Sequence, residues 1–159
     1  MKSEGVSSFP LAEHVAETLD IGPGTRVFEV DCGDGDFLIP LHQNNFIVGG
    51  IDGDPDAIAQ AIAAMPDGIF QVSLASALDP GVPWHVVVCR SFADAPDTNY
   101  LRGVLARMFA KATHAIALLD VPDSRRQWML HALTEIGANA IQFEDVTTTG
   151  DTFNVFARV

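Results

Sequence analysis

Two carboxylates and a short glycine loop are the residues of this sequence best suited to hold a ligand. Glu29 stands in an apolar β-branched run, Val27–Val30, which breaks into Asp31-Cys32-Gly33-Asp34-Gly35. Such a turn exposes backbone N–H groups and carries small residues, so a ligand can approach it closely. Asp52 ends the next apolar run. Because a carboxylate can accept bonds from two hydroxyls, this layout suggests an adenosine-type cofactor with its ribose held by Asp52.

Each of the two carboxylates has a structural alternative. Asp52 could cap a helix that begins near Pro55 instead of binding a ribose. Glu29 could be structural, although a carboxylate inside an apolar strand needs partners, and loop N–H groups or a cofactor ammonium would serve. We favour the site role for both residues.

Metal and thiol chemistry are weaker alternatives. Cys32 and Cys89 are the only cysteines and lack metal-ligand spacing, which favours a reduced, cytoplasmic protein. Small apolar fillers of a tight pocket are the favoured interpretation for both, over nucleophiles. Two acidic clusters also fail the spacing of a calcium loop, so no metal site is expected: Asp31, Asp34 and Asp36, and Asp52, Asp54 and Asp56.

Composition limits the number of domains and the classes of partner. A chain of 159 residues with 48% hydrophobic content is sized for a single domain, 1–159, with an N-terminal helical segment, 1–24, before a core, 25–159. A net charge of −12 without a basic face argues against unaided binding to nucleic acid or anionic lipid. No apolar run reaches the ~18 residues of a membrane helix, and no signal peptide is expected at the N-terminus.

Apolar periodicity predicts alternating helices and strands. Helices are expected over Pro10–Leu19 (capped by Ser7 or Ser8), from Phe37, from Pro55, from a cap at Thr98 or Asn99, and from a cap at Ser124 to Gly137. Strands are expected at Val27–Val30, Phe46–Ile51, Ile69–Leu74, His85–Cys89, His114–Leu119, Ala140–Val146 and Thr152–Val159.

This order predicts an α/β fold. Five strands that alternate with helices imply right-handed crossovers and parallel pairing, while the last two strands lack a helix between them and should form an antiparallel hairpin. We therefore expect a three-layer α/β/α sandwich with a mostly parallel seven-stranded sheet and an antiparallel C-terminal hairpin strand. Its ligand cleft should lie at the carboxyl ends of the first and fourth strands.

From about Leu11 to Val159 the chain resembles the class I S-adenosylmethionine-dependent methyltransferases. Glu29 matches the acid that ends their first strand, Gly33 and Gly35 match two loop glycines, and Asp52 matches their ribose-binding acid. The resemblance implies a Rossmann-like methyltransferase fold and S-adenosylmethionine as cofactor. The cofactor residues it implies are Glu29, Asp31, Cys32, Gly33, Gly35, Asp52, Gly53, Leu74, Ala75 and Arg90.

Three positions depart from the family pattern. Asp31 stands at the first loop glycine, where it could pair with the amino group of the cofactor or repel its carboxylate. Leu74 replaces the acid that usually faces the adenine amino group, and His85 replaces an acid at the start of the fourth strand. The loss of one buried charged hydrogen bond costs roughly 1–3 kcal/mol, so we expect weakened rather than abolished cofactor binding.

The acceptor of the methyl group is not specified by the sequence. The loop after the fourth strand lacks the Asn-Pro-Pro-aromatic signature of amide and nucleobase amino methylation, and no catalytic base stands out. Weak candidates for substrate contact are Phe92, Asp94, Tyr100 and His14. The open cleft of so small a domain suggests a homodimer or a bulky substrate that completes it.

We consider three functions for this sequence. The favoured one is methyl transfer to an oxygen, nitrogen or carbon nucleophile of a small molecule or of a group presented by a partner. The second is a methyltransferase-fold protein that binds S-adenosylmethionine or S-adenosylhomocysteine without methyl transfer, or uses the cofactor in another reaction. A nicotinamide-dependent oxidoreductase is disfavoured, because Leu38 stands where the third glycine of its loop is needed.

Overall fold

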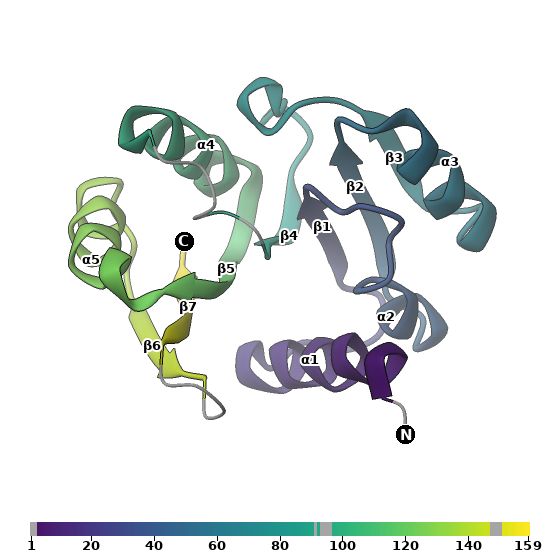
Figure 1. Ribbon diagram of the computed structural model, residues 1–159, viewed down its shortest axis with the longest axis horizontal. Coiled ribbons are helices and arrows are strands. Elements are labelled where there is room, and N and C mark those ends of the chain that lie inside the picture. Colours follow the sequence, from purple (N-terminus) through teal and green to yellow (C-terminus); the bar gives the residue numbers. More distant parts are fainter. Residues whose placement is uncertain (1–2, 91, 93–96, 147–150) are drawn as a thin grey trace. The chain divides into compact units, whose positions relative to one another are not determined.

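The computed structural model describes residues 3–90, 92, 97–146 and 151–159. The chain forms two compact units, Met1–Ala75 (unit 1) and Ser76–Val159 (unit 2). Helices and strands alternate along both of them (Figure 1).

Unit 1 contains three parallel strands in the order β3-β2-β1. Val30 pairs with Ile51, and Asp52 pairs with Val72, so the carboxyl ends of the strands lie at one edge. Helix α3 contacts β2 and β3, and α2 contacts β2 and α1 (Figure 1). The elements are α1 (Ser3–Leu19), β1 (Arg26–Val30), α2 (Ile39–Gln43), β2 (Ile47–Asp52), α3 (Pro55–Ala64) and β3 (Ile69–Val72).

Local sequence explains why α3 starts where it does. The Asp54 carboxylate accepts a hydrogen bond from the Asp56 N–H at 3.0 Å, and Pro55 occupies the first turn. An acid at the N-cap satisfies a free N–H group and complements the helix dipole, while proline there loses no hydrogen bond. Ile58 and Ala61 form the buried face.

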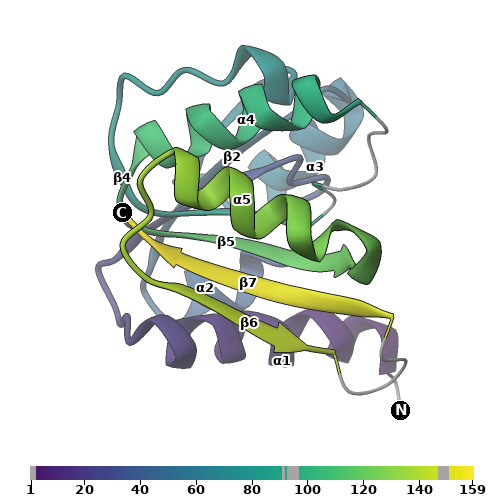
Figure 2. The ribbon, with the colours of Figure 1, turned by 90° about the vertical axis from the view of Figure 1, so that its left-hand side faces the viewer.

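The described part of unit 2 contains four strands, in the order β4-β5-β7-β6. β4 runs parallel to β5, whereas β7 is antiparallel to both β5 and β6. The expected antiparallel C-terminal hairpin is therefore confirmed. Both long helices lie on the same side of these strands (Figures 1 and 2). The elements are η1 (Ala75–Ala77), which begins at the unit boundary, β4 (Trp84–Cys89), α4 (Thr98–Lys111), β5 (Ala112–Pro122), η3 (Asp123–Arg125), α5 (Arg126–Glu135), β6 (Ile141–Asp145) and β7 (Thr152–Arg158).

Four predicted helix starts are wrong. α2 begins at Ile39 and not at Phe37. α1 begins at Ser3, so Pro10 lies inside it, although proline there removes one backbone hydrogen bond and crowds the preceding turn. The cap of α4 is Asp97, whose carboxylate accepts from the Asn99 N–H at 2.9 Å and complements the helix dipole. α5 follows a 3-10 turn and starts at Arg126 without a side-chain cap at Ser124.

The ends of β3 and β5 differ from the predicted ends, because pairing with a neighbouring strand determines where each one stops. β3 stops at Val72, the residue paired with the last residue of β2. β5 extends to Pro122, because β7 pairs with it as far as Thr152. Apolar pattern alone does not contain this pairing, since it is set by the partner strand.

Candidate functional site

The first strand carries a carboxylate into the interior. The Glu29 side chain is 0% exposed in an otherwise apolar strand. Burial of a carboxylate is costly unless hydrogen bonds or charges compensate it. Its Oε1 atom is buried and has no hydrogen-bond partner among the described residues, while the residue has other interactions, and its charge acts on the Cys32 thiol. Glu29 thus places a buried carboxylate next to the last residue of β1, close to the loop that follows.

That loop contains three residues in the left-handed region. Asp31, Gly33 and Gly35 have φ values of 58°, 58° and 85°, a region that glycine adopts without steric cost. A Cβ atom at Gly35 would lie 2.6 Å from Met65 Cε, the end of a flexible side chain, so it is the positive φ that favours glycine here. A Cβ atom at Gly33 would meet nothing within 4 Å. The chain therefore leaves open space beside Gly33.

Asp52 connects the two loops at the carboxyl ends of β1 and β2. Its Oδ2 atom accepts a hydrogen bond from the Gly33 N–H at 2.9 Å, and its Oδ1 atom accepts one from the Asp54 N–H at 2.9 Å. The helix cap is Asp54, so the capping alternative for Asp52 is wrong. A carboxylate offers about four lone-pair sites, so each oxygen retains acceptor capacity for a ligand hydroxyl.

Gly50 is a residue whose role the sequence analysis missed. A Cβ atom there would lie 2.7 Å from the Glu29 carbonyl oxygen and 2.9 Å from Cys32 Sγ. Only glycine allows β2 to approach the end of β1 so closely. The signal was present, because Gly49 and Gly50 interrupt a run of strand-forming residues.

Cys32 is buried among acidic groups. Burial, together with the charges of Glu29, Asp52 and Asp31, raises the pKa of its thiol from 9.0 to about 12. Its backbone N–H donates to the Ile51 carbonyl at 2.9 Å. A thiol that stays protonated is a poor nucleophile, which agrees with a packing role.

Leu74 lies beside the Asp52 loop. Its side chain is 64% exposed, and its Cδ2 atom would be 3.1 Å from a Cβ atom placed on Gly53. The neighbouring Ser73 N–H donates to the Asp52 carbonyl at 3.0 Å, and Ala75 is buried. An exposed apolar side chain next to a fixed carboxylate could cover the flat face of a ligand ring.

Unit 1 therefore brings together most of the predicted cofactor residues. Contacts or electrostatic interactions join Glu29, Asp31, Cys32, Gly33, Asp52, Gly53 and Leu74. Gly35 belongs to the same loop and packs toward Met65.

Three further predicted residues of the site, Arg90, Phe92 and Tyr100, belong to unit 2. Arg90 follows β4 and is half-buried. Phe92 is buried, with its ring centroid 6.3 Å from that of Trp128, a contact that the sequence did not indicate. Tyr100 on α4 is exposed, and Asp94 lies outside the described residues. The proposed contacts of these residues with a ligand stay predictions.

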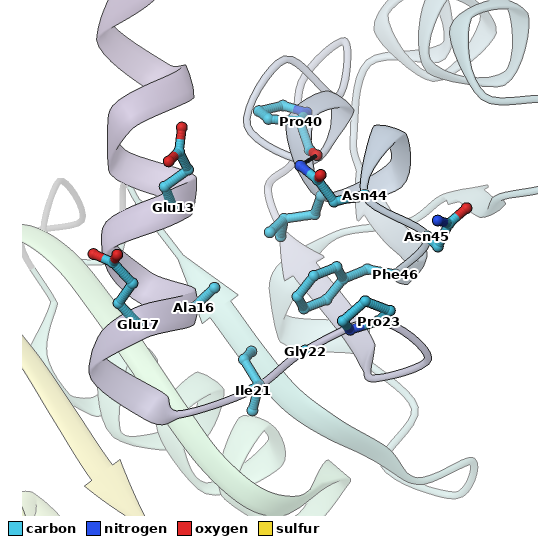
Figure 3. A pocket seen from close by; sticks show the side chains of 11 residues that line it. Glu13, Ala16, Glu17, Ile21, Gly22, Pro23, Pro40, Asn44, Asn45 and Phe46 are labelled. Carbon is cyan, nitrogen blue, oxygen red and sulfur yellow. Dashed lines mark hydrogen bonds between the residues drawn. The ribbon is translucent and has the colours of Figure 1, made fainter.

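His14 lies half-buried on α1, and the same helix borders a cavity of about 570 Å³. Figure 3 shows α1 on one side of this cavity and the segment around Asn44 and Phe46 on the other. Its lining contains none of the predicted cofactor residues of the described chain. The lining residues are Glu13, Ala16, Glu17, Ile21, Gly22, Pro23, Pro40, Leu41, Asn44, Asn45 and Phe46.

Neither a metal-ligand cluster nor a membrane-spanning helix occurs among the described residues. No group of three or more His, Cys, Asp or Glu side chains there could hold a metal ion. None of the helices in these ranges has the length and apolar character needed to cross a membrane.

Comparisons with known proteins identify the fold. No protein-family model and no curated protein matches the sequence. The structure is similar to magnesium protoporphyrin IX methyltransferase from Synechocystis PCC 6803 with bound S-adenosylmethionine, at a TM-score of 0.80 and 19% identity over 96% of this chain and 80% of the other.

Two further structures give the same result. An amino pentose methyltransferase from Micromonospora echinaspora with bound S-adenosylmethionine matches at a TM-score of 0.78 and 15% identity, over 99% of this chain and 92% of the other. A TehB-like S-adenosylmethionine-dependent methyltransferase from Corynebacterium glutamicum matches at 0.72 and 16%, over 93% and 86% of the two chains. The predicted fold class is confirmed: the chain has the Rossmann-like fold of the class I S-adenosylmethionine-dependent methyltransferases.

Proposed function

We propose that the protein is an S-adenosylmethionine-dependent methyltransferase. Its acceptor would be an oxygen, nitrogen or carbon nucleophile of a small molecule or of a group presented by a partner. The observation that carries the proposal is the fixed position of the Asp52 carboxylate. Two backbone N–H groups from separate loops hold it at 2.9 Å each, next to the open space beside Gly33.

The residues of unit 1 suit the parts of this cofactor. Asp52 would accept hydrogen bonds from the ribose hydroxyls, and the exposed Leu74 with Gly53 would contact the adenine ring. Glu29 and Asp31 carry negative charge on the methionine side of the loop, where an ammonium group would be stabilised. Two similar methyltransferase structures hold S-adenosylmethionine, which supports the same choice of cofactor.

In this reaction the protein would act mainly by positioning the reactants. When bound, S-adenosylmethionine supplies a methyl group on a sulfonium centre, suited to in-line transfer to a nucleophile. Asp52 and the glycine loop would orient the cofactor. Because alignment of two reactants alone lowers such a barrier substantially, no catalytic base is required, and we assign none.

A second candidate function is cofactor binding without methyl transfer. The observation that favours it is Asp31, an acidic residue in the left-handed conformation at the position where the family has glycine. A carboxylate there can repel the carboxylate of the cofactor and leave it poorly aligned.

Calorimetric titration with S-adenosylmethionine and S-adenosylhomocysteine tests both candidates. We expect binding by the wild type and a ten- to hundredfold loss for Asp52→Asn, since a lost charged hydrogen bond costs about 1.5–3 kcal/mol. Asp56→Asn, an exposed acid on the adjoining helix, is the matched control and should bind like the wild type. No binding of either compound at millimolar concentration contradicts both functions.

A product screen separates the two candidates. The protein is incubated with S-adenosylmethionine and a panel of acceptors, and mass spectrometry looks for products heavier by one methyl group. Methylated product that disappears in Asp52→Asn but persists in Asp56→Asn supports methyl transfer. Cofactor binding without any methylated product across the panel favours the second candidate.

A further inference from the structure

Strand β3 forms an edge with exposed apolar side chains. It ends the strand order in unit 1 and pairs with β2 on one side. Ile69 is 54% exposed and Val72 is 49% exposed, and Leu74, just after the strand, is still more so. An exposed edge strand of strand-forming apolar residues is a ready template for pairing with another strand.

The backbone of β3 has a side that faces away from β2. The Ser73 N–H donates to the Asp52 carbonyl at 3.0 Å. Since N–H and C=O groups of successive residues alternate in direction along a strand, Gln71 and Ile69 also face β2. The N–H and C=O groups of Phe70 and Val72 therefore point to the outer edge. No strand in the described part of the chain pairs with that edge.

The edge is also free of charge. No Asp, Glu, Lys or Arg occurs between Asp67 and Asp79, in a chain of net charge −12. Edge strands are commonly protected from pairing by charged side chains, and this one has none. Two copies of so acidic a chain repel each other over most of their surfaces. The electrostatic repulsion between them is therefore smallest where two uncharged edges meet.

We propose that two copies of this chain dimerise through the β3 edge, with the two strands antiparallel around a two-fold axis. A two-fold interface must be self-complementary, and the outward N–H and C=O groups of one β3 are matched by those of a second. Phe70 lies opposite Val72 of the second copy, and the two residues exchange backbone hydrogen bonds. Gln71 then lies on the axis, opposite Gln71 of the second copy.

This register uses both outward residues of both strands. A shift by two residues would pair Phe70 with itself and place Val72 opposite Gly68, beyond the end of β3. The proposed register therefore makes the larger number of backbone hydrogen bonds. The inference concerns unit 1 alone and does not depend on the proposed function.

Sedimentation equilibrium of the full chain tests the dimer. We expect a concentration-dependent dimer whose fraction rises with added salt, because salt screens the repulsion between two acidic copies. Val72→Lys should weaken association at least about tenfold, since it places like charges near each other in the interface. Val82→Lys is the matched control, an exposed valine in unit 2, and should associate like the wild type.

Two outcomes would overturn the proposal. One is a monomer at every protein and salt concentration tested. The other is an equal loss of association in Val72→Lys and Val82→Lys, which would assign the interface to another surface or to general charge.

Cross-linking tests the register independently. Side chains directly opposite each other in a non-hydrogen-bonded antiparallel pair have Cβ atoms about 4.5–5.5 Å apart, near enough for a disulfide after small adjustments. Gln71→Cys should therefore form a covalent dimer under mild oxidation, whereas Gln127→Cys, exposed on α5, should not. Both native cysteines are buried and do not interfere. Equal cross-linking of the two variants, or none in either, contradicts the register.

Discussion

The Gly33 N–H donates a 2.9 Å hydrogen bond to Asp52 Oδ2 and so ties the glycine loop after β1 to the end of β2. The Asp54 N–H holds the other oxygen of the same carboxylate. The Asp52 carboxylate is therefore held in one orientation by the chain itself. A preoriented acceptor reduces the entropy lost on binding.

Replacement of Gly50 by alanine should destabilise the protein. The added Cβ would lie 2.7 Å from the Glu29 carbonyl oxygen and 2.9 Å from Cys32 Sγ. The carbonyl oxygen belongs to the backbone of β1 and cannot move away easily. Overpacking of this kind costs about 1–3 kcal/mol of unfolding free energy. Denaturant unfolding measures it. The control is Gly103→Ala on α4, where a Cβ meets nothing within 4 Å, and which should stabilise by about 0.5–1 kcal/mol.

The conformation of Asp31 predicts an order of stability between two variants. With φ at 58°, alanine at this position should be less stable than glycine by about 1–2 kcal/mol, since a Cβ is disfavoured in the left-handed region. Both variants lose the carboxylate and its interactions, so their comparison isolates the backbone term. Chemical denaturation of Asp31→Gly and Asp31→Ala checks the order.

Asp120 is the control position for Asp31. It has the same φ of 58° in unit 2, so Asp120→Gly should again be more stable than Asp120→Ala. The variants at residue 31 should also change the affinity for S-adenosylmethionine, and those at residue 120 should not. Equal stability of glycine and alanine at residue 31 would be incompatible with a strained backbone there.

The fold could be predicted from the sequence because its signals are local. The apolar run before Asp31 and the run before Asp52 each bury a strand, and the missing helix between the last two strands indicates a hairpin. Hydrophobic period and turn residues report such features without knowledge of the tertiary structure.

The contacts of the candidate site were less predictable. The sequence shows that residue 52 is an acid at the end of a strand. The two N–H groups that bind it could not be predicted, because they depend on how β1 and β2 end side by side. The burial of Phe92 against Trp128 joins residues far apart in the chain. Such pairs arise from packing between elements, which single-sequence periodicity does not contain.

Phe92 should contribute to stability rather than only to substrate contact. Its ring is 4% exposed and lies 6.3 Å from the Trp128 ring. Truncation of a buried phenylalanine costs about 3–5 kcal/mol, so Phe92→Ala should lower the unfolding free energy by an amount in that range. Tyr100→Ala removes an exposed ring and should cost far less. A stable Phe92→Ala variant with impaired activity would instead support a substrate role.

The Cys32 thiol should make the protein less stable at alkaline pH. Its pKa rises from 9.0 to about 12 in the folded state, chiefly through burial. Below about pH 9 the thiol is protonated in both states, and its full contribution to stability is present. Between about pH 9 and 12 the unfolded chain releases the proton while the folded chain keeps it, so stability falls by about 1.4 kcal/mol per pH unit.

The difference in unfolding free energy between wild type and Cys32→Ala isolates this effect from other alkaline titrations. It should be constant up to about pH 9 and then move steadily in favour of the variant as the pH rises toward 12. Thiol labelling at pH 8 in a Cys89→Ser background should leave Cys32 unmodified until denaturant is added, because the reactive form is the thiolate. Rapid labelling of the native protein would mean that Cys32 is neither buried nor held protonated.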